Sequence, residues 1–457
     1  MTVRNALKEL LALAGQGVAP EVPVEFTGGD PVFPTPYLVG TAGAAVLAAV
    51  GTAAARLWFL KTGRIQNVTM DVRSAAAAMR SARYLRIDGK PPKEAWDPLS
   101  GYYPVKDGRW VSIHCNFANH REAAMKVLGN PADRAAAEAA SAGWDGLALE
   151  EAIHAAKGCA GLARRAEEWA RHPHSAAVAA QPLLEIEKIA DSKPEPLPDG
   201  TRPLSGVRVL DLTRVLAGPT CARTLAEHGA DVLKIAGPHL PDSGSSEFDT
   251  GVGKLQAFLD LRIDKDKEKL SGLLKSSDVF SQSFRPGALA ARGFSPEKAA
   301  ELRPGIVYVT LSAWGTEGPW RDRRGFDSIV QTVSGMAYAQ GGEKPKLMPV
   351  SAIDYVSGYL MAYGAMLALA RRATEGGSWR VRVSLARTGK WIVDRGFNAD
   401  FASVPSELPT EELKKLTIQS GNYTHLRPVL GLSETPPYWD RPPAPLGSHP
   451  AAWPTLA

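Results

Sequence analysis

The sequence predicts an α/β protein made of a doubly wound, Rossmann-like large domain and a smaller α+β domain. After about residue 204, short apolar runs alternate with helical patterns, as in doubly wound sheets. Before that point, an Asp-Gly turn between two alternating segments predicts a hairpin, and alanine-rich helices follow it. Between the two regions, Asp191–Pro203 contains four prolines and no apolar periodicity, which is typical of a linker.

Residues 1–85 are predicted to form a helix–strand–helix element that occurs twice in the chain. Thr41–Val72 matches Asp354–Leu385 at a constant offset of 313, and Gly51 then matches Gly364. Each copy reads as a small-residue helix, a glycine-bearing turn, a short strand and a second helix. The first copy is degenerate, because it has Thr41 at the Asp354 position and a hydroxyl cannot do the chemistry of a carboxylate.

One segment of the first copy has the length of a membrane span. Leu38–Ala55 has 18 residues and no charge. It is built mostly of alanine, glycine and valine, and alanine and glycine contribute little transfer free energy. Its counterpart begins with an acidic residue. We therefore expect a buried helix and no membrane partner.

Residues 86–190 are predicted to form the small α+β domain, and residues 191–203 the linker. Tyr102–Val105 and Trp110–Asn116 flank the hairpin turn. Helices are expected around 122–127, 132–142, 149–156 and 162–171. His172-Pro173-His174 has no clustered carboxylates or cysteines beside it, which favours a surface loop, so no metal is expected.

Residues 204–400 are predicted to form the Rossmann-like domain, and residues 401–457 a proline-rich tail that wraps the surface. Strands over Val207–Leu212 and Asp231–Ile235 with a helix over Pro219–His228 make a βαβ unit. Further strands are expected at 257–261, 279–284 and 305–311. The first turn lacks G-x-G-x-x-G, which disfavours a nicotinamide dinucleotide but not another nucleotide-bearing ligand at the carboxyl end of the sheet.

Charge and cysteine content narrow the setting of the protein. A net charge of +5 over 457 residues does not indicate nucleic acid and suits anionic small molecules. Cys115, Cys159 and Cys221 are far apart in the sequence and form no CxxC pair. We therefore expect a reducing, cytoplasmic compartment.

Four segments of the second half resemble the class III CoA-transferases, which include formyl-CoA and carnitine CoA-transferases and the related 2-methylacyl-CoA racemases. They are Pro203–Ile235, Phe284–Gly315, Gly325–Gly341 and Pro349–Arg372, in family order and at family spacing. The resemblance implies an enzyme that moves CoA from an acyl-CoA donor to a carboxylic acid acceptor, with CoA as co-substrate.

The first half resembles the small domain of the same family. The hairpin segment 106–115 and the helices after it fit that domain, and the stretch 435–450 fits the family's terminal segment. The first half thus resembles a copy without the large domain, and the second a copy without the small one. We expect a fused duplication in which the two copies complete one unit. The family usually forms interlocked homodimers, and such a homodimer is one expectation for this chain. The other is that the fused chain takes the place of the dimer and acts as a single chain.

The resemblance makes Asp354 the catalytic nucleophile. In the implied mechanism its carboxylate attacks the acyl-CoA thioester to give a mixed anhydride, and the returning CoA thiolate gives an aspartyl-CoA thioester. From spacing alone, Asp354 reads as a helix N-cap, the commonest role of aspartate at a helix start.

By the same resemblance, five residues are expected to contact CoA. They are Leu216 and Ala217 in the first turn, Lys254 near the phosphates, Phe284 beside the cofactor and Arg324 along the pantetheine path. Three positions depart from the family pattern, since Ala236 and Gly237 replace a Glu-Arg pair and Ala291 replaces an arginine next to Arg292. Losing arginine–phosphate pairs weakens CoA binding unless Lys234, His239 or first-half residues replace them.

Two other functions stay open at this point. A non-catalytic CoA-binding paralogue fits the altered contact positions, whereas the retained Asp354 argues against it. A 2-methylacyl-CoA racemase would carry histidine at the Phe326 position. An aromatic hydrocarbon cannot abstract an α-proton, so racemisation is disfavoured.

Overall fold

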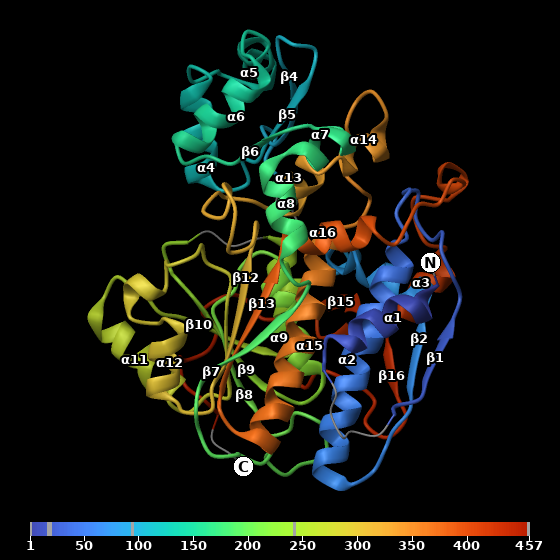
Figure 1. The fold of residues 1–457 in the computed structure, drawn as a ribbon, viewed down its shortest axis with the longest axis vertical. Coiled ribbons are helices and arrows are strands. Elements are labelled where there is room, and N and C mark those ends of the chain that lie inside the picture. The colour runs from blue at the N-terminus through green and yellow to red at the C-terminus, as the bar shows by residue number, and fades with distance from the viewer. Residues whose placement is uncertain (1, 16–20, 93–95, 241–243, 455–457) are drawn as a thin grey trace.

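Figure 1 shows the fold as a computed structural model, which describes residues 2–15, 21–92, 96–240 and 244–454. Its largest sheet has seven strands in the order β10-β9-β8-β11-β12-β13-β7. These strands are β7 (Glu185–Ala190), β8 (Arg208–Asp211), β9 (Asp231–Ala236), β10 (Lys254–Phe258), β11 (Val279–Gln282), β12 (Val307–Ser312) and β13 (Ser378–Ser384). All neighbours pair in parallel except the edge strand β7, which is antiparallel to β13. The predicted doubly wound α/β fold is confirmed.

Helices cover both faces of this sheet. They include α9 (Ala217–Glu227) and α15 (Ala352–Glu375) on one face and α11 (Asp264–Leu274) and α12 (Pro296–Leu302) on the other. Strand β8 explains the two-sided core, because Val209 joins the α9–α15 cluster and the next residue, Leu210, joins the α11–α12 cluster. Successive side chains of a strand point to opposite faces, so a strand buried on both sides is apolar throughout.

The small domain stands at one end of the sheet (Figure 1). It consists of β4 (Gly101–Pro104), β5 (Trp110–Ile113) and β6 (Ala160–Leu162) with α4 (Ala118–Val127), α5 (Arg134–Ser141) and α6 (Gly146–Ala155). Its apolar side chains form a cluster separate from the main core. Its strand β5 pairs antiparallel with both β4 and β6.

The boundary expected at residue 190 is wrong in one respect, because β7 belongs to the large sheet. The helices α7 (Ala166–Arg171) and α8 (Pro173–Ala180) lead from the small domain to it. His174, expected in a surface loop, is fully buried: its imidazole contacts the Trp314 carbonyl at 3.1 Å and accepts the Trp320 N–H at 3.2 Å. The proline-rich 191–203 segment is anchored rather than free, since Ser192 accepts the Gly377 N–H through its carbonyl.

The internal repeat recurs as matching elements. The first copy is α2 (Val39–Thr62), β2 (Val68–Asp71) and α3 (Val72–Ala78), and the second is α15, β13 and α16 (Leu385–Val393). An offset of 313 carries both ends of α2 onto both ends of α15, and the last residue of β2 onto the last residue of β13. The two long helices pack against each other in the middle of the molecule (Figure 1).

Each copy is completed by a strand from the other half of the chain. β7, from the first half, pairs with β13, and β16 (Leu430–Leu432), from the second half, pairs with β2. An ideal Cβ on Gly51 would meet Leu430 at 2.9 Å, and one on Gly364 would meet Leu184 at 2.8 Å. The glycines thus give each crossing strand room, and the two halves are interlocked.

α2 and α15 are each long and apolar enough to cross a membrane by length and composition. In α2, 83% of the most apolar window is buried inside the protein, and in α15 the share is 94%. Both are core helices here, as expected for Leu38–Ala55. Their small residues let them approach neighbouring helices closely.

The remaining elements frame this core. They are α1 (Val3–Ala12), β1 (Val24–Thr27), β3 (Arg86–Ile87), α10 (Ser245–Gly251), α13 (Asp327–Val333), α14 (Met336–Gly341), α17 (Thr410–Leu416), β14 (Thr417–Ser420) and β15 (Tyr423–Leu426), with 3₁₀ turns at Ser81–Tyr84, Ala290–Arg292 and Phe401–Ser403. β1 pairs with β2, and β3 pairs with β15. After β16 the tail runs along the large domain, where Tyr438 donates its N–H to the Glu227 carbonyl and His449 donates to Gln256.

Candidate active site

A cavity of about 760 Å³ opens at the carboxyl ends of the sheet strands. Its walls come from the segments after β8, β9, β10, β11 and β12, from the start of α15, and from Phe117, Asn119 and His120 of the small domain. Doubly wound sheets bind ligands at this edge, because the loops after the strands diverge there. The first half of the chain therefore contributes directly to a pocket whose floor belongs to the second half.

Asp354 lies in the first turn of α15 and lines this cavity. The helix N-cap is Ser351, whose side chain makes no capping hydrogen bond. The capping role falls instead to Asp327, at the start of α13, whose carboxylate accepts the Asp354 N–H at 3.1 Å. The spacing-based reading of Asp354 as an N-cap is wrong, and its carboxyl is left to face the pocket.

The pKa values of both aspartates are raised in this site. Burial raises the pKa of Asp354 well above its usual range, and the Asp327 charge raises it further. Burial also raises the pKa of Asp327 to about 6, although hydrogen bonds from Gln331 and from the Asp354 and Ile353 N–H groups oppose that rise. Neighbouring like charges in an enclosed site disfavour double ionisation. The pair therefore holds a proton more tightly than two exposed carboxyls would.

Four of the five residues expected to contact CoA line the cavity. They are Leu216, Ala217, Phe284 and Arg324. Lys254 does not: it is fully buried, and its ammonium group donates to Asp211 at 2.9 Å and to the Pro219 carbonyl at 2.8 Å. Its ammonium group thus holds the end of β8 to the start of α9. The Lys254 side chain does not reach the surface of the cavity.

The positions that depart from the family pattern also line the cavity. Ala236, Gly237 and Ala291 present no charge there. Three basic residues line the same region, namely His239, Arg262 and Arg292, whereas Lys234 forms a buried ion pair with Glu247. The expectation that Lys234 replaces the missing arginines is therefore wrong. His239 lines the cavity and can still take their place.

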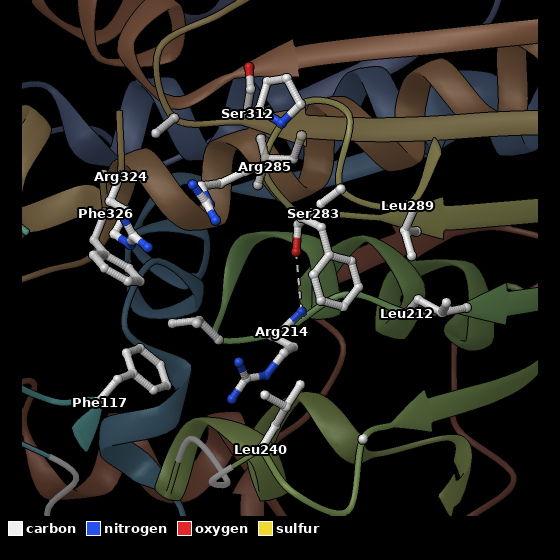
Figure 2. A pocket seen from close by; sticks show the side chains of 18 of the residues that line it. Phe117, Leu212, Arg214, Leu240, Ser283, Arg285, Leu289, Ser312, Arg324 and Phe326 are labelled. Atoms are coloured by element: carbon white, nitrogen blue, oxygen red, sulfur yellow. Dashed lines mark hydrogen bonds between the residues drawn. The ribbon is translucent and has the colours of Figure 1, made fainter. Parts of the chain in front are cut away.

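An aromatic wall closes the cavity beside the small domain. Phe326 stacks on His114 with ring centroids 3.9 Å apart and planes 9° from parallel. Phe117 lies 5.7 Å from Phe326, and Figure 2 shows both rings on the same side of the pocket. Sequence reasoning missed His114, Phe117 and His120, because no local motif marks them and only tertiary contact brings them to Phe326.

The described residues contain no group of three or more histidine, cysteine, aspartate or glutamate side chains arranged to hold a metal ion. Cys115, Cys159 and Cys221 are free and buried. Burial raises the pKa of the Cys115 thiol to about 12, so that group is protonated at neutral pH.

Taken together, the sheet, the pocket at its carboxyl edge and the carboxyl at a helix start define an α/β protein with a ligand pocket built around one aspartate. The model of CoA-transferase family III matches residues 16–195 and 204–424, and the chain belongs to this family. The match lies on both sides of the proline-rich segment, in agreement with family-like sequence in each half.

Known proteins are similar to parts of this chain. An acetyl-coenzyme A transferase of Hypoxylon pulicicidum is 36% identical over 200 residues, 42% of this chain and 34% of that protein. An acyl-CoA transferase of Gibberella moniliformis is 28% identical over 413 residues, which cover 79% of this chain and 72% of that protein. A formyl-CoA:oxalate CoA-transferase of Rhodopseudomonas palustris is 34% identical over 199 residues, which cover 40% of this chain and 47% of that protein. The chain thus spans about a third of the first relative and about half of the third.

Proposed function

We propose that this chain transfers CoA from an acyl-CoA donor to a carboxylic acid acceptor, with Asp354 as the nucleophile. The observation that carries the proposal is the Asp354 carboxyl, which starts α15 and lines a cavity of about 760 Å³ at the carboxyl edge of the sheet. Membership of the CoA-transferase family and the activities for which the relatives are named support it.

The proposed reaction conserves the thioester in four balanced steps. The Asp354 carboxylate attacks the thioester carbonyl, the C–S bond breaks, and CoA thiolate leaves a mixed anhydride. The thiolate attacks the aspartyl carbonyl and releases the donor acid as its carboxylate. The acceptor carboxylate then attacks the aspartyl-CoA thioester, which restores an anhydride and free thiolate. Attack of this thiolate on the acceptor carbonyl yields the new acyl-CoA and the free Asp354 carboxylate.

The surroundings of Asp354 favour such a sequence. The Asp354 carboxyl lies in a cavity that Phe117 and Phe326 also line, and substrate bound there would limit the access of water that would hydrolyse an anhydride. Asp327 accepts the Asp354 N–H at 3.1 Å and so fixes the start of the helix. The positive end of α15 favours negative charge developing at the aspartyl oxygens.

The rival function is CoA binding without catalysis. The observation that favours it is the absence of charge at Gly237 and Ala291, both of which line the cavity. The nearby Arg262 and Arg292 weigh against it, because each lines the same cavity and carries a guanidinium suited to phosphate. Racemisation is disfavoured again, since Phe326 offers no base and the imidazole stacked on it, His114, is buried.

The proposal is tested by trapping the covalent intermediate. The full chain is incubated with acetyl-CoA, succinyl-CoA or oxalyl-CoA and then with hydroxylamine or borohydride, and the peptide containing Asp354 is analysed by mass spectrometry. We expect a hydroxamate or a reduced side chain on Asp354, and neither in Asp354→Asn. CoA binding with no modification by any donor would overturn the transferase proposal in favour of the binding protein.

The same proposal extends to the setting of the protein. Three free, buried cysteines support a cytoplasmic, reducing compartment. The interlocked halves support activity in a single fused chain, and a homodimer is the alternative assembly. Light scattering of the full chain distinguishes the two assemblies.

A further inference from the structure

The N-terminus of α4 points into the candidate active site. Its N-cap is Phe117, which has no side-chain acceptor for the first N–H groups, and the first turn of the helix places Asn119 and His120 on the cavity wall. Within the described chain, the Ala118 and Asn119 N–H groups donate to no partner. An uncapped helix start carries partial positive charge and attracts anions.

His120 is a buried polar side chain at this helix start. It is only 8% exposed, and its Nδ1 atom has no hydrogen-bond partner among the described residues. Its ring lies 5.8 Å from that of Phe326. Burial, with the positive charges of Arg324, Arg285 and Arg214, lowers the pKa of His120 to about 4. The imidazole is therefore neutral at neutral pH.

Two guanidinium groups from the second half face the same region. Arg285 follows β11 and Arg324 precedes α13, and both line the cavity. Neither side chain forms an ion pair or hydrogen bond with a described residue, and Figure 2 shows both extending beside Phe326. Burial and the charge of Arg285 lower the pKa of Arg324, which shows that the two guanidinium groups repel each other.

The cavity wall carries a large excess of positive charge. The lining residues include Arg214, Arg262, Arg285, Arg292, Arg321, Arg323 and Arg324. Among the described lining residues Asp354 is the only acid, and burial raises its pKa. Arg262 and Arg323 have carboxylate partners outside the cavity wall, namely Asp260 and Glu151. Arg285 and Arg324 have no carboxylate partner among the described residues, which leaves both guanidinium groups able to pair with a bound anion.

We propose that the start of α4, His120, Arg285 and Arg324 form a binding centre for an anionic oxygen group of the substrates, a carboxylate or a phosphate. The inference rests on the proposed function, which supplies two sources: the carboxylate of the acid substrate and the diphosphate of CoA. The centre is built from both halves of the chain, so neither half alone contains it.

The test measures equilibrium binding, which needs no covalent step and therefore separates this centre from the role of Asp354. Calorimetry compares Arg285→Ala and His120→Gln with wild type for CoA, pantetheine and succinate, the last in the presence of saturating CoA. Arg121→Ala is the matched control, because Arg121 lies next to His120 on α4 but forms only a surface pair with Asp97 at 3.6 Å. Because charge-assisted hydrogen bonds contribute substantially to binding free energy, we expect Arg285→Ala to weaken the binding of at least one probe by about tenfold or more.

The pattern of losses identifies the anion. Weaker CoA binding with unchanged pantetheine binding assigns the centre to the diphosphate. Weaker succinate binding with unchanged CoA binding assigns it to the acid substrate. Binding of all three probes within twofold of wild type in both variants, as in Arg121→Ala, would overturn the proposal. Thermal melting of each variant is measured in parallel, and Arg285→Lys, which keeps the charge, is expected to recover part of the loss.

Proton uptake gives a second readout that a merely structural His120 would not produce. The groups facing His120 are Arg214 of the β8–α9 turn, Arg285, Arg324 and the neutral His114 of β5. An anion bound among them raises the imidazole pKa from about 4. Binding at pH 5.5 in buffers of different ionisation enthalpy should then show proton uptake by wild type and less by His120→Gln. Equal uptake by both proteins contradicts a role for His120.

Discussion

Gly358 places α15 against the first turn of α9, and substituting it tests how the site is held. An ideal Cβ on Gly358 would overlap the Ala217 carbonyl oxygen and lie 2.7 Å from Thr220 Cβ. Ala217 lines the cavity, and Gly358 lies one turn after Asp354. Gly358→Ala should therefore lower both the stability of the protein and its affinity for CoA.

The size of the effect follows from two opposing contributions. Carbon atoms make their best contacts at about 3.5–4.0 Å, so Thr220 must retreat by about 1 Å and the Ala217 backbone must also move. Overpacking of this kind costs about 1–3 kcal/mol, whereas replacing glycine by alanine inside a helix gains about 1 kcal/mol. Gly272 in α11 is the matched control, because nothing lies within 4 Å of its added Cβ. Gly272→Ala should show the gain alone, and Gly358→Ala should be less stable than it by about 1–3 kcal/mol.

Urea denaturation of both variants followed by tryptophan fluorescence measures the difference, and calorimetry with CoA measures the effect on the site. The reasoning is refuted if Gly358→Ala is as stable as Gly272→Ala and binds CoA as wild type does. A destabilised variant with wild-type CoA affinity would show that the first turn of α9 holds its position without this contact.

Four further predictions concern charge and chain connectivity. Asp327→Asn should lower the pKa of Asp354 and move the acid limb of Asp354 adduct formation to lower pH, as a pH series of trapped adduct would record. Because the pKa of Asp327 is raised from 3.8 to about 6, its ionisation opposes folding, so the stability present below about pH 4 is lost as pH rises through 6. Urea titrations at pH 4 and 7 should show a smaller loss in Asp327→Asn than in wild type, since Asp354, whose pKa is also raised, still titrates in the variant. Lys254→Met should destabilise the protein by about 3–5 kcal/mol in urea, because it leaves buried Asp211 unpaired, and a variant as stable as wild type would contradict the importance of this buried pair. Pro203–Ala457 expressed alone should be unstable or inactive, since β7 and the small-domain wall are missing, and a stable, fully active fragment would contradict the fused unit.

The sequence was informative where function depends on local pattern. The alternation of strands and helices predicted the doubly wound sheet, and the repeat at offset 313 predicted that Leu38–Ala55 is an internal helix like α15. Resemblance placed Leu216, Ala217, Phe284 and Arg324 in segments that do line one cavity. In these cases a residue's role follows from its position within one element.

The features that could not be predicted depend on contacts between distant elements. Lys254 was expected to contact CoA, but in the structure its buried side chain pairs with Asp211 of the neighbouring part of the sheet. β7 reads as the end of the small domain, and only its pairing with β13 assigns it to the large sheet. His120 carries no motif, and its role depends on the approach of α4 to a segment about 200 residues later, which periodicity and propensity do not encode.

Because the two halves exchange strands, the fold of the first half can be completed only after most of the second half has been synthesised. Met70 of β2 pairs with Leu430 of β16, 360 residues further along the chain. Until that strand is synthesised, β2 has an exposed edge and α2 has only part of its covering. Long-range pairing of this kind slows folding, and an unpaired edge invites association with other chains. We therefore expect the nascent first half to be prone to misassembly, and to benefit from a chaperone, until β16 has been synthesised.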